Sequence, residues 1–247
     1  MRPQTNLQEE SSLLYWFPKI EDILPVPKTI ILEFSGDEAR QLLNLLDGKM
    51  CSEELYTEIK AAGNQIGYPL FLRTDQGSGK HDWKDTCYVK SPDEVVSHAA
   101  NLAGYEVVSH AVNLAGWQTC EFLPSPRALV FREMLPLYST FTAFWQQGLP
   151  IAKERRYFVE NGKILCHHPY WPEGAIQYPD HENWVALLED MNREDETEVK
   201  ELTKMAEIFS RAVPGFYSVD FAMTKDGRWY MIDAARGELS WHPEHEE

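Results

Sequence analysis

The chain has 247 residues, 43% hydrophobic and 12% aromatic, which supports one medium domain or two small lobes and excludes a disordered chain. Its formal net charge of -16 at pH 7 argues against general nucleic-acid binding, because contacts with phosphates need a basic surface. The four cysteines form no Cys-x-x-Cys pair and no apolar stretch could span a bilayer, so we expect a cytoplasmic protein without a disulfide framework, a zinc site or a membrane partner.

The first half of the chain is expected to hold an arm and a lobe. Residues 1–25 would form the N-terminal arm, with Leu13 to Phe17 as an apolar anchor, and residues 26–131 the N-terminal lobe. Apolar patterning predicts the elements of this lobe, with strands over 26–32, 68–74 and 86–89 and helices over 37–46 and 52–62. Gly63 is the expected end of the second helix.

A polar loop with two glycines, Asp75 to Lys80, separates two of these strands. It does not have P-loop spacing, because Thr74 stands where that motif needs a glycine. The backbone N–H groups of such a loop can still bind phosphates, with Lys80 and Arg73 adding positive charge. An ordinary hairpin loop is the alternative.

A tandem duplication follows, in which residues 94–105 and 106–117 are near-identical copies of 12 residues each. Inserting 12 residues into a continuous helix rotates everything after it by roughly 120°. We therefore expect Gly104 to break the helix and the duplication to lie at the surface. His98 and His110 are excluded as a metal pair, because on a helix they would lie about 18 Å apart.

Residues 132–247 are predicted to form the C-terminal lobe, entered from a strand over 128–135. Its other predicted elements are a hairpin with strands 152–158 and 163–166 around Asn161-Gly162, and helices over 183–191 and 196–212. His167 and His168, which follow Cys166, are interpreted as structural because no second ligand pair with matching spacing accompanies them. Strands and helices alternate in both halves, which is typical of an α+β fold of two lobes.

A last hairpin is predicted around Asp226-Gly227. A two-residue loop at this dipeptide sets the register, which pairs Met223 with Tyr230, Phe221 with Ile232, and Asp220 with Asp233. The two aspartates would then share one face with Cβ atoms about 5 Å apart, where like charges destabilise a sheet. A hard cation such as Mg²⁺ would offset the repulsion. The alternative is a solvated hairpin whose register slips by one residue.

The predicted strand around Lys153 to Tyr157 places Glu154 and Arg156 on one face and Arg155 on the other. Arg156 could contact a polyphosphate, and Glu154 a nucleotide or a cation. A surface ion pair of little energetic value is the alternative.

These segments, in this order, resemble the ATP-grasp superfamily. The segments that carry the resemblance are Val26 to Thr29, Pro69 to Arg73, the glycine loop, Arg132 to Leu135, Glu154-x-Arg156, Val219 to Phe221 and Met231 to Asp233. The pattern Phe71 to Asp75 with Ser78-x-Lys80-His81 is similar to that of the R2K clade. The resemblance implies an α+β, two-lobed ATP-grasp fold with antiparallel sheets and a nucleotide cleft between the lobes.

The resemblance also implies ATP and Mg²⁺ as cofactors. The implied site residues are Arg73 and Lys80 for the phosphates, Glu133, Met134 and Leu135 for the adenine, Glu154 for the nucleotide, Arg156 as the catalytic residue at the γ-phosphate, and Asp220 and Asp233 for the metal. The second metal strand departs from the usual Glu-x-Asn, since Asp233-Ala234-Ala235 lacks the amide ligand.

Two functions stay open at this point. The first is an ATP-dependent carboxylate-amine or peptide ligase, which would act through an acyl-phosphate on a small molecule or peptide with a carboxylate. The second is a degenerate ATP-grasp nucleotide-binding module that acts through a protein partner. The missing amide favours the module, whereas the retained aspartates and Arg156 favour the ligase.

Overall fold

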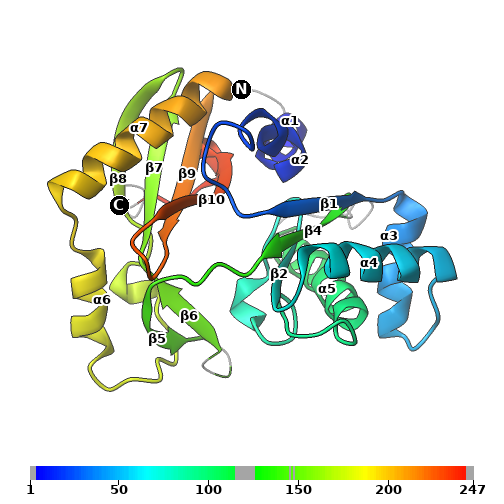
Figure 1. Ribbon diagram of the computed structural model, residues 1–247. Coiled ribbons are helices and arrows are strands. Elements are labelled where there is room, and N and C mark those ends of the chain that lie inside the picture. Colours follow the sequence, from blue (N-terminus) through cyan, green and yellow to red (C-terminus); the bar gives the residue numbers. More distant parts are fainter. Residues whose placement is uncertain (1–3, 115–125, 145, 147, 243–247) are drawn as a thin grey trace. The chain divides into compact units, whose positions relative to one another are not determined.

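The computed structural model describes residues 4–114, 126–144, 146 and 148–242 (Figure 1). Internal contacts divide the chain into two compact units. One unit consists of residues 28–134, and the other combines residues 1–27 with residues 135–247. None of the helices in the described part is both long enough and apolar enough to cross a membrane.

The unit of residues 28–134 is built on a four-stranded sheet with the order β1-β4-β2-β3 and antiparallel pairing throughout. Its strands are β1 (Thr29–Glu33), β2 (Leu70–Thr74), β3 (Tyr88–Val89) and β4 (Ala128–Glu133). Its helices are α3 (Gly36–Leu46), α4 (Glu53–Ile66) and α5 (Val95–Leu114). Helices α4 and α5 contact the sheet and α3 packs on α5 (Figure 1). The leucines, isoleucine and valines between these layers form the core.

Two glycines predicted to end or break helices lie inside them. Helix α4 runs through Gly63 to Ile66, and α5 continues through Gly104 without interruption. A Cβ atom on Gly104 would lie 2.5 Å from Leu46 Cδ1, so the missing side chain allows α3 and α5 to approach each other closely. The predicted break at Gly104 is therefore wrong, because tertiary packing and not helix termination requires the glycine.

The expectation that the duplication lies at the surface is wrong for its first copy. Val95, Ala99, Leu102 and Ala103 are fully buried in the core of this unit. His98 is also buried, and its Nδ1 lies 3.1 Å from the Thr86 carbonyl oxygen. The first copy thus supplies the apolar face on which the sheet packs.

The second unit contains a four-stranded antiparallel sheet with the order β10-β9-β7-β8. Its strands are β7 (Glu154–Glu160), β8 (Lys163–Pro169), β9 (Phe216–Met223) and β10 (Trp229–Arg236), and a separate pair consists of β5 (Ser139–Ala143) and β6 (Leu149–Ala152). Its helices are α1 (Gln4–Ser11), α2 (Leu13–Trp16), α6 (Trp184–Asn192) and α7 (Glu196–Ala212). Helix α7 packs along β7, β8 and β9 (Figure 1).

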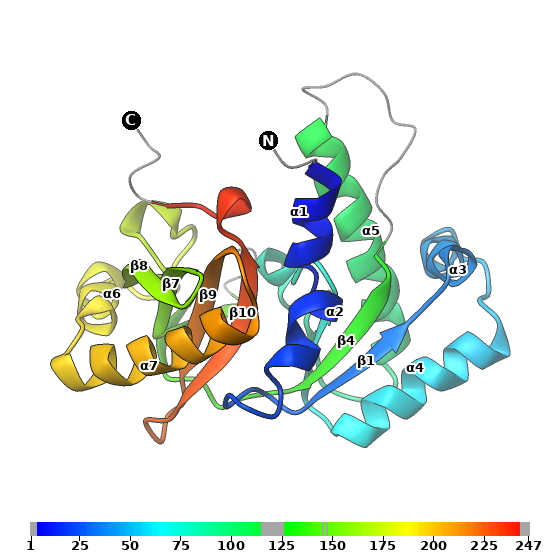
Figure 2. The same ribbon diagram turned by 90° about the horizontal axis from the view of Figure 1, so that it is seen from above.

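The N-terminal arm packs on this second unit, where α1 and α2 contact β10 (Figure 2). Leu13, Trp16 and Phe17 are buried, and the Trp16 ring lies 6.4 Å from the ring of Phe209 on α7. The backbone N–H of Arg236 donates a hydrogen bond to Ser11 Oγ at 2.9 Å. The arm therefore contributes to the core of the unit that contains residues 135–247.

The Asn161-Gly162 hairpin has the predicted turn, whereas the Asp226-Gly227 hairpin has only part of its predicted pairing. Asn161 and Gly162 both have positive φ angles (48° and 83°), and Glu160 pairs with Lys163, which confirms the two-residue Asn-Gly turn. In the last hairpin, Asp220 pairs with Asp233 as predicted. The other predicted pairs are wrong by one residue, since Tyr230 pairs with Ala222 and Met231 with Phe221.

Two irregularities in the last hairpin explain this result. The loop is one residue longer than predicted, because Thr224 N–H bonds to the Arg228 carbonyl and Gly227 takes φ 81°. The ladder then shifts between Met231 and Asp233, so that Ile232 forms a bulge. The longer loop and the bulge compensate each other and return the two aspartates to opposed positions.

Candidate functional site

Four polar residues form one row across the sheet β10-β9-β7-β8. Asp233 on β10 pairs with Asp220 on β9, Asp220 pairs with Arg156 on β7, and Arg156 pairs with His168 on β8. Residues directly opposite each other in an antiparallel ladder share a face, and neighbouring strands lie about 4.8 Å apart. The row therefore brings two carboxylates, a guanidinium and an imidazole to one face of the sheet.

Arg156 and Asp220 form a bidentate ion pair at the centre of this row. Arg156 Nε donates to Asp220 Oδ1 at 2.8 Å, and Nη2 donates to Oδ2 at 2.7 Å. The two side chains are only 14% and 7% exposed. Burial alone lowers the pKa of Arg156, but the Asp220 carboxylate outweighs it and the pKa is raised. Arg156 thus offsets the charge of Asp220.

Asp233 and Glu154 flank this ion pair. Asp233 Oδ1 accepts a hydrogen bond from the Ala234 N–H at 3.0 Å. Glu154, two residues before Arg156 on β7, is buried and accepts a hydrogen bond from Trp171 Nε1 at 3.1 Å. Across residues 4–114, 126–144, 146 and 148–242, no three His, Cys, Asp or Glu side chains gather so as to hold a metal ion. Mg²⁺ is commonly bound through one or two carboxylates with phosphate oxygens and water, and Asp220 with Asp233 could supply that part.

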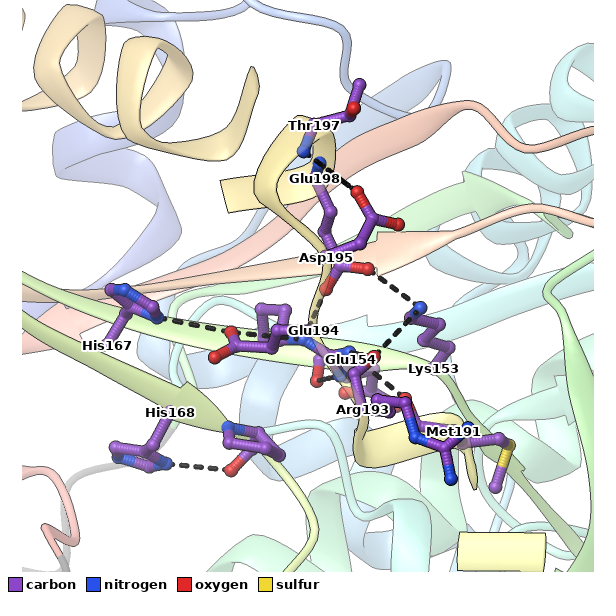
Figure 3. Close-up of polar contacts among 12 residues, drawn as sticks. Lys153, Glu154, His167, His168, Met191, Arg193, Glu194, Asp195, Thr197 and Glu198 are labelled. Carbon is purple, nitrogen blue, oxygen red and sulfur yellow. Dashed lines mark hydrogen bonds and ion pairs between the residues drawn. The ribbon is translucent and has the colours of Figure 1, made fainter. Parts of the chain in front are cut away.

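The opposite face of β7 carries a separate ion network (Figure 3). Arg155 is fully buried, pairs with Glu198 and Glu194, and donates to the Met191 carbonyl at 3.0 Å. The alternation predicted for Glu154, Arg155 and Arg156 is thus confirmed. This network is structural, because it connects β7 and β8 to the chain between α6 and α7. The polar row with Arg156 lies on the other face of the sheet.

His168 is the member of the row that the sequence interpretation missed. Its Nδ1 lies 2.7 Å from the Pro169 carbonyl oxygen, while Nε2 is buried without a hydrogen-bond partner among the described residues. Burial lowers the pKa of His168, with Arg156 acting in the same direction. Figure 3 shows His167 and His168 on opposite sides of β8, with His167 beside Glu194. A regular ladder from the Asn161-Gly162 turn would pair Arg156 with His167, and the register shift between Phe158 and Val159 brings His168 there instead, so the sequence carried no signal for it.

Arg73 and Lys80 form a second group of candidates in the unit of residues 28–134. Arg73 is buried, and its Nε donates to the Thr74 carbonyl at 3.1 Å. Burial raises the pKa of Cys87 to about 12, whereas the charges of Lys80 and Arg73 oppose this effect. Both basic side chains therefore lie within electrostatic range of the same thiol.

The glycine loop after β2 is closed by its own side chains. Thr74 Oγ1 accepts hydrogen bonds from the N–H groups of Gln76 and Gly77 at 3.3 and 3.0 Å. These two N–H groups already have an acceptor within the loop. For them the ordinary-loop interpretation describes the structure better than a phosphate cradle.

Glu133, Met134 and Leu135 lie where the chain passes between the two units. Glu133 Oε1 accepts a hydrogen bond from the Lys28 N–H at 2.7 Å, and the Glu133 N–H donates to the Lys28 carbonyl at 2.9 Å. Two residues after Leu135, Leu137 forms a bridge with Thr224 beyond the end of β9. This linking segment is therefore held at Lys28 before it and at Thr224 after it.

The model of a family described as ATP-grasp domain, R2K clade family 3, matches residues 61–247. No curated protein sequence gives a significant match.

Many solved structures are similar in fold to this chain. C-terminally truncated Cdc123 from Schizosaccharomyces pombe has a TM-score of 0.62 at 16% identity, over 100% of this chain and 94% of that one. An N5-carboxyaminoimidazole synthase from Aspergillus clavatus, in complex with ADP and 5-aminoimidazole ribonucleotide, has a TM-score of 0.52 at 11% identity, over 94% of this chain and 45% of that one. These likenesses confirm the predicted α+β fold with antiparallel sheets.

Proposed function

Because this chain belongs to the ATP-grasp domains of R2K clade family 3, we propose that it is a nucleotide-binding module that binds ATP with Mg²⁺ and acts through a protein partner. The observation that carries the proposal is the row in which Arg156 lies between two opposed aspartates and His168 on one sheet face. A guanidinium can donate two hydrogen bonds to a phosphate group, and carboxylate oxygens can bind Mg²⁺.

The remaining predicted residues complete the proposed site. Arg156 would bind the terminal phosphate, Asp220 and Asp233 would hold Mg²⁺ together with phosphate oxygens, and Glu154 would contact the nucleotide. Arg73 and Lys80 would neutralise phosphate charge, and Glu133, Met134 and Leu135 would line the adenine. Mg²⁺ would neutralise negative charge on the phosphates and so allow the protein to bind them.

Two observations support a binding module over a ligase. The second metal strand reads Asp233-Ala234-Ala235 and offers no amide ligand. The likeness to Cdc123 extends over nearly the whole of both chains, whereas the synthase is covered over 45% of its length.

A ligase acting through an acyl-phosphate is the second candidate, and the buried Arg156 favours it. A guanidinium held at a terminal phosphate can stabilise charge that develops during phosphoryl transfer to a carboxylate. A ligase should release more ADP when carboxylates and amines are added, and Arg156→Ala should lower turnover more than ATP affinity. The module should show ATP occupancy without any such increase.

Thermal and urea denaturation test the nucleotide site. ATP with Mg²⁺ should raise the free energy of unfolding by about 2.7 kcal/mol at a hundredfold excess over Kd. Asp233→Asn should remove most of the part of this gain that depends on Mg²⁺. We choose Asp233 because Asp220→Asn would also break the ion pair with Arg156.

Asp190→Asn is the matched control, since Asp190 is 68% exposed and lies on α6 of the same unit. It should keep the full gain. Equal gains in Asp233→Asn and the wild type would show that Mg²⁺ binds elsewhere, and no gain with ATP in the wild type would refute nucleotide binding.

A further inference from the structure

His168 ends the polar row on the side away from the aspartates. It is the cross-strand neighbour of Arg156, and Arg156 separates it from Asp220. The rings of Trp241 and His242 lie 5.5 and 5.8 Å from its own ring, in edge-to-face geometry. The imidazole is thus held by aromatic neighbours beside the guanidinium proposed to bind the terminal phosphate.

The hydrogen bond to Pro169 fixes which ring nitrogen carries the proton. A carbonyl oxygen can only accept, so His168 Nδ1 must donate across the 2.7 Å contact. In the neutral imidazole, Nε2 is then an acceptor. This nitrogen is buried and has no partner among the described residues. A buried acceptor without a donor is costly, and such a group in a native structure calls for an explanation.

The chemistry of ATP limits which groups can donate a hydrogen bond to His168 Nε2. Phosphate oxygens are themselves acceptors, so they cannot satisfy Nε2. The donors of ATP lie on its ribose and adenine, at the end of the molecule away from the terminal phosphate. A water molecule beside the terminal phosphate would supply the donor that Nε2 lacks among the described residues.

We propose that His168 Nε2 accepts a hydrogen bond from a water molecule beside the terminal phosphate and orients it for a slow hydrolysis of ATP. The proposal rests on the nucleotide site described above and goes beyond it, because a binding module needs no reaction. Such a hydrolysis would limit the lifetime of the ATP-bound form.

The reaction itself follows the usual course of phosphoryl transfer to water. The water oxygen forms a bond to the γ-phosphorus, and the bond from that phosphorus to the oxygen bridging to the β-phosphate breaks. ADP leaves with the bonding electron pair, inorganic phosphate forms, and the proton released passes to solvent. His168 contributes orientation, as water-positioning residues do in other enzymes that hydrolyse nucleoside triphosphates.

The test measures ADP release from ATP and Mg²⁺ by the full chain, with ATP-dependent stabilisation measured in parallel. His168→Phe keeps an aromatic ring against Trp241 and His242 but removes the acceptor. It should lower kcat about tenfold or more, while the ATP-dependent stabilisation stays at the wild-type value. His168→Gln restores an acceptor and should recover part of kcat. His167→Phe, on the opposite face of β8, is the matched control and should leave kcat unchanged.

Several results would overturn the proposal. These are a wild type that releases no ADP, a His168→Phe variant that hydrolyses ATP at the wild-type rate, and a loss of kcat that only mirrors lost ATP binding. If His168→Phe does not fold, His168→Met replaces it, since methionine adapts to irregular packing and is a poor acceptor. ATP-dependent stabilisation with unchanged hydrolysis in these variants refutes this inference alone. Absence of any stabilisation by ATP refutes the nucleotide site itself.

Discussion

At the scale of single residues, the ion pair between Arg156 and Asp220 decides how two opposed aspartates are tolerated on one sheet face. Asp220 and Asp233 are cross-strand neighbours, an arrangement that by itself destabilises a sheet. Arg156 binds both oxygens of Asp220, and the charge of Asp233 also contributes to the raised pKa of Arg156. Arg156 thus pairs directly with Asp220 and also feels the charge of Asp233, and the ion pair with Asp220 is largely buried.

Breaking the ion pair between Arg156 and Asp220 should destabilise the fold. Arg156→Ala would leave Asp220 buried beside Asp233 without its cation, which should lower the free energy of unfolding by about 3–5 kcal/mol. Urea denaturation measures the change. In Arg156→Ala/Asp220→Ala no uncompensated charge remains at Asp220, so the double variant should be less destabilised than the sum of the single variants.

The exposed pair of Arg193 and Asp190, with side chains 76% and 68% exposed, is the matched control. Arg193→Ala removes such a surface pair and should change stability by less than about 1 kcal/mol. A similarly small effect of Arg156→Ala would mean that Asp220 reaches solvent or another cation.

At the scale of elements, the duplicated segment shows how one helix accommodates a repeat. Helix α5 is continuous from Val95 to Leu114, and the residues of its first copy fill the core. The two copies differ only where Ala100 is replaced by Val112 and Tyr105 by Trp117. If either copy is deleted, the remaining copy can therefore pack on the sheet with nearly the same sequence.

Deletion of each copy in turn tests this interpretation. Removing 106–117 keeps Ala100, which is 3% exposed, and should leave a folded protein with ATP affinity little changed. Removing 94–105 should also leave a folded protein that binds ATP. It places valine where alanine is buried, and this overpacking should cost about 1–3 kcal/mol.

Ala100→Val in the full chain is the control and should show the same cost as the second deletion. Thermal unfolding and ATP-dependent stabilisation measure both properties. Loss of folding or of ATP binding in both deletions would show that the full length of the segment is needed.

At the scale of the whole molecule, the chain returns to the unit in which it started. The arm at the N-terminus packs on β10 and α7, although more than a hundred residues of the other unit separate it from them in sequence. Trp16 is 1% exposed, the Arg236 guanidinium lies 3.0 Å from the Glu10 carboxylate, and the Arg236 backbone N–H donates a hydrogen bond to Ser11 Oγ. The arm therefore belongs to the fold of the unit that carries the polar row.

Truncating the arm should consequently destabilise that unit. Trp16→Ala would remove a large buried ring and should lower the free energy of unfolding by about 3–5 kcal/mol. Ile23→Ala, at a position that is 52% exposed, should have little effect. Urea denaturation compares the two variants, and an unchanged midpoint for Trp16→Ala would show that the arm is dispensable.

The sequence by itself determined the features that depend on local interactions. Helix α7 has the predicted bounds, Glu196 to Ala212, because its apolar spacing and its capping Asp195 lie within one segment. The Asn161-Gly162 turn and the alternation of Glu154, Arg155 and Arg156 also follow from neighbouring residues. The recognition of an ATP-grasp chain of the R2K clade was likewise available from short segments and their order.

Only the tertiary structure decided the features that depend on residues far apart in the chain. Gly104 lies inside a helix because Leu46 packs against it, and Ile232 forms a bulge that restores the pairing of the two aspartates. Arg156 meets Asp220 and His168 only through the registers of β7 with β9 and β8. A cross-strand register is set by the packing of whole sheets and by bulges, so local sequence patterns cannot supply it.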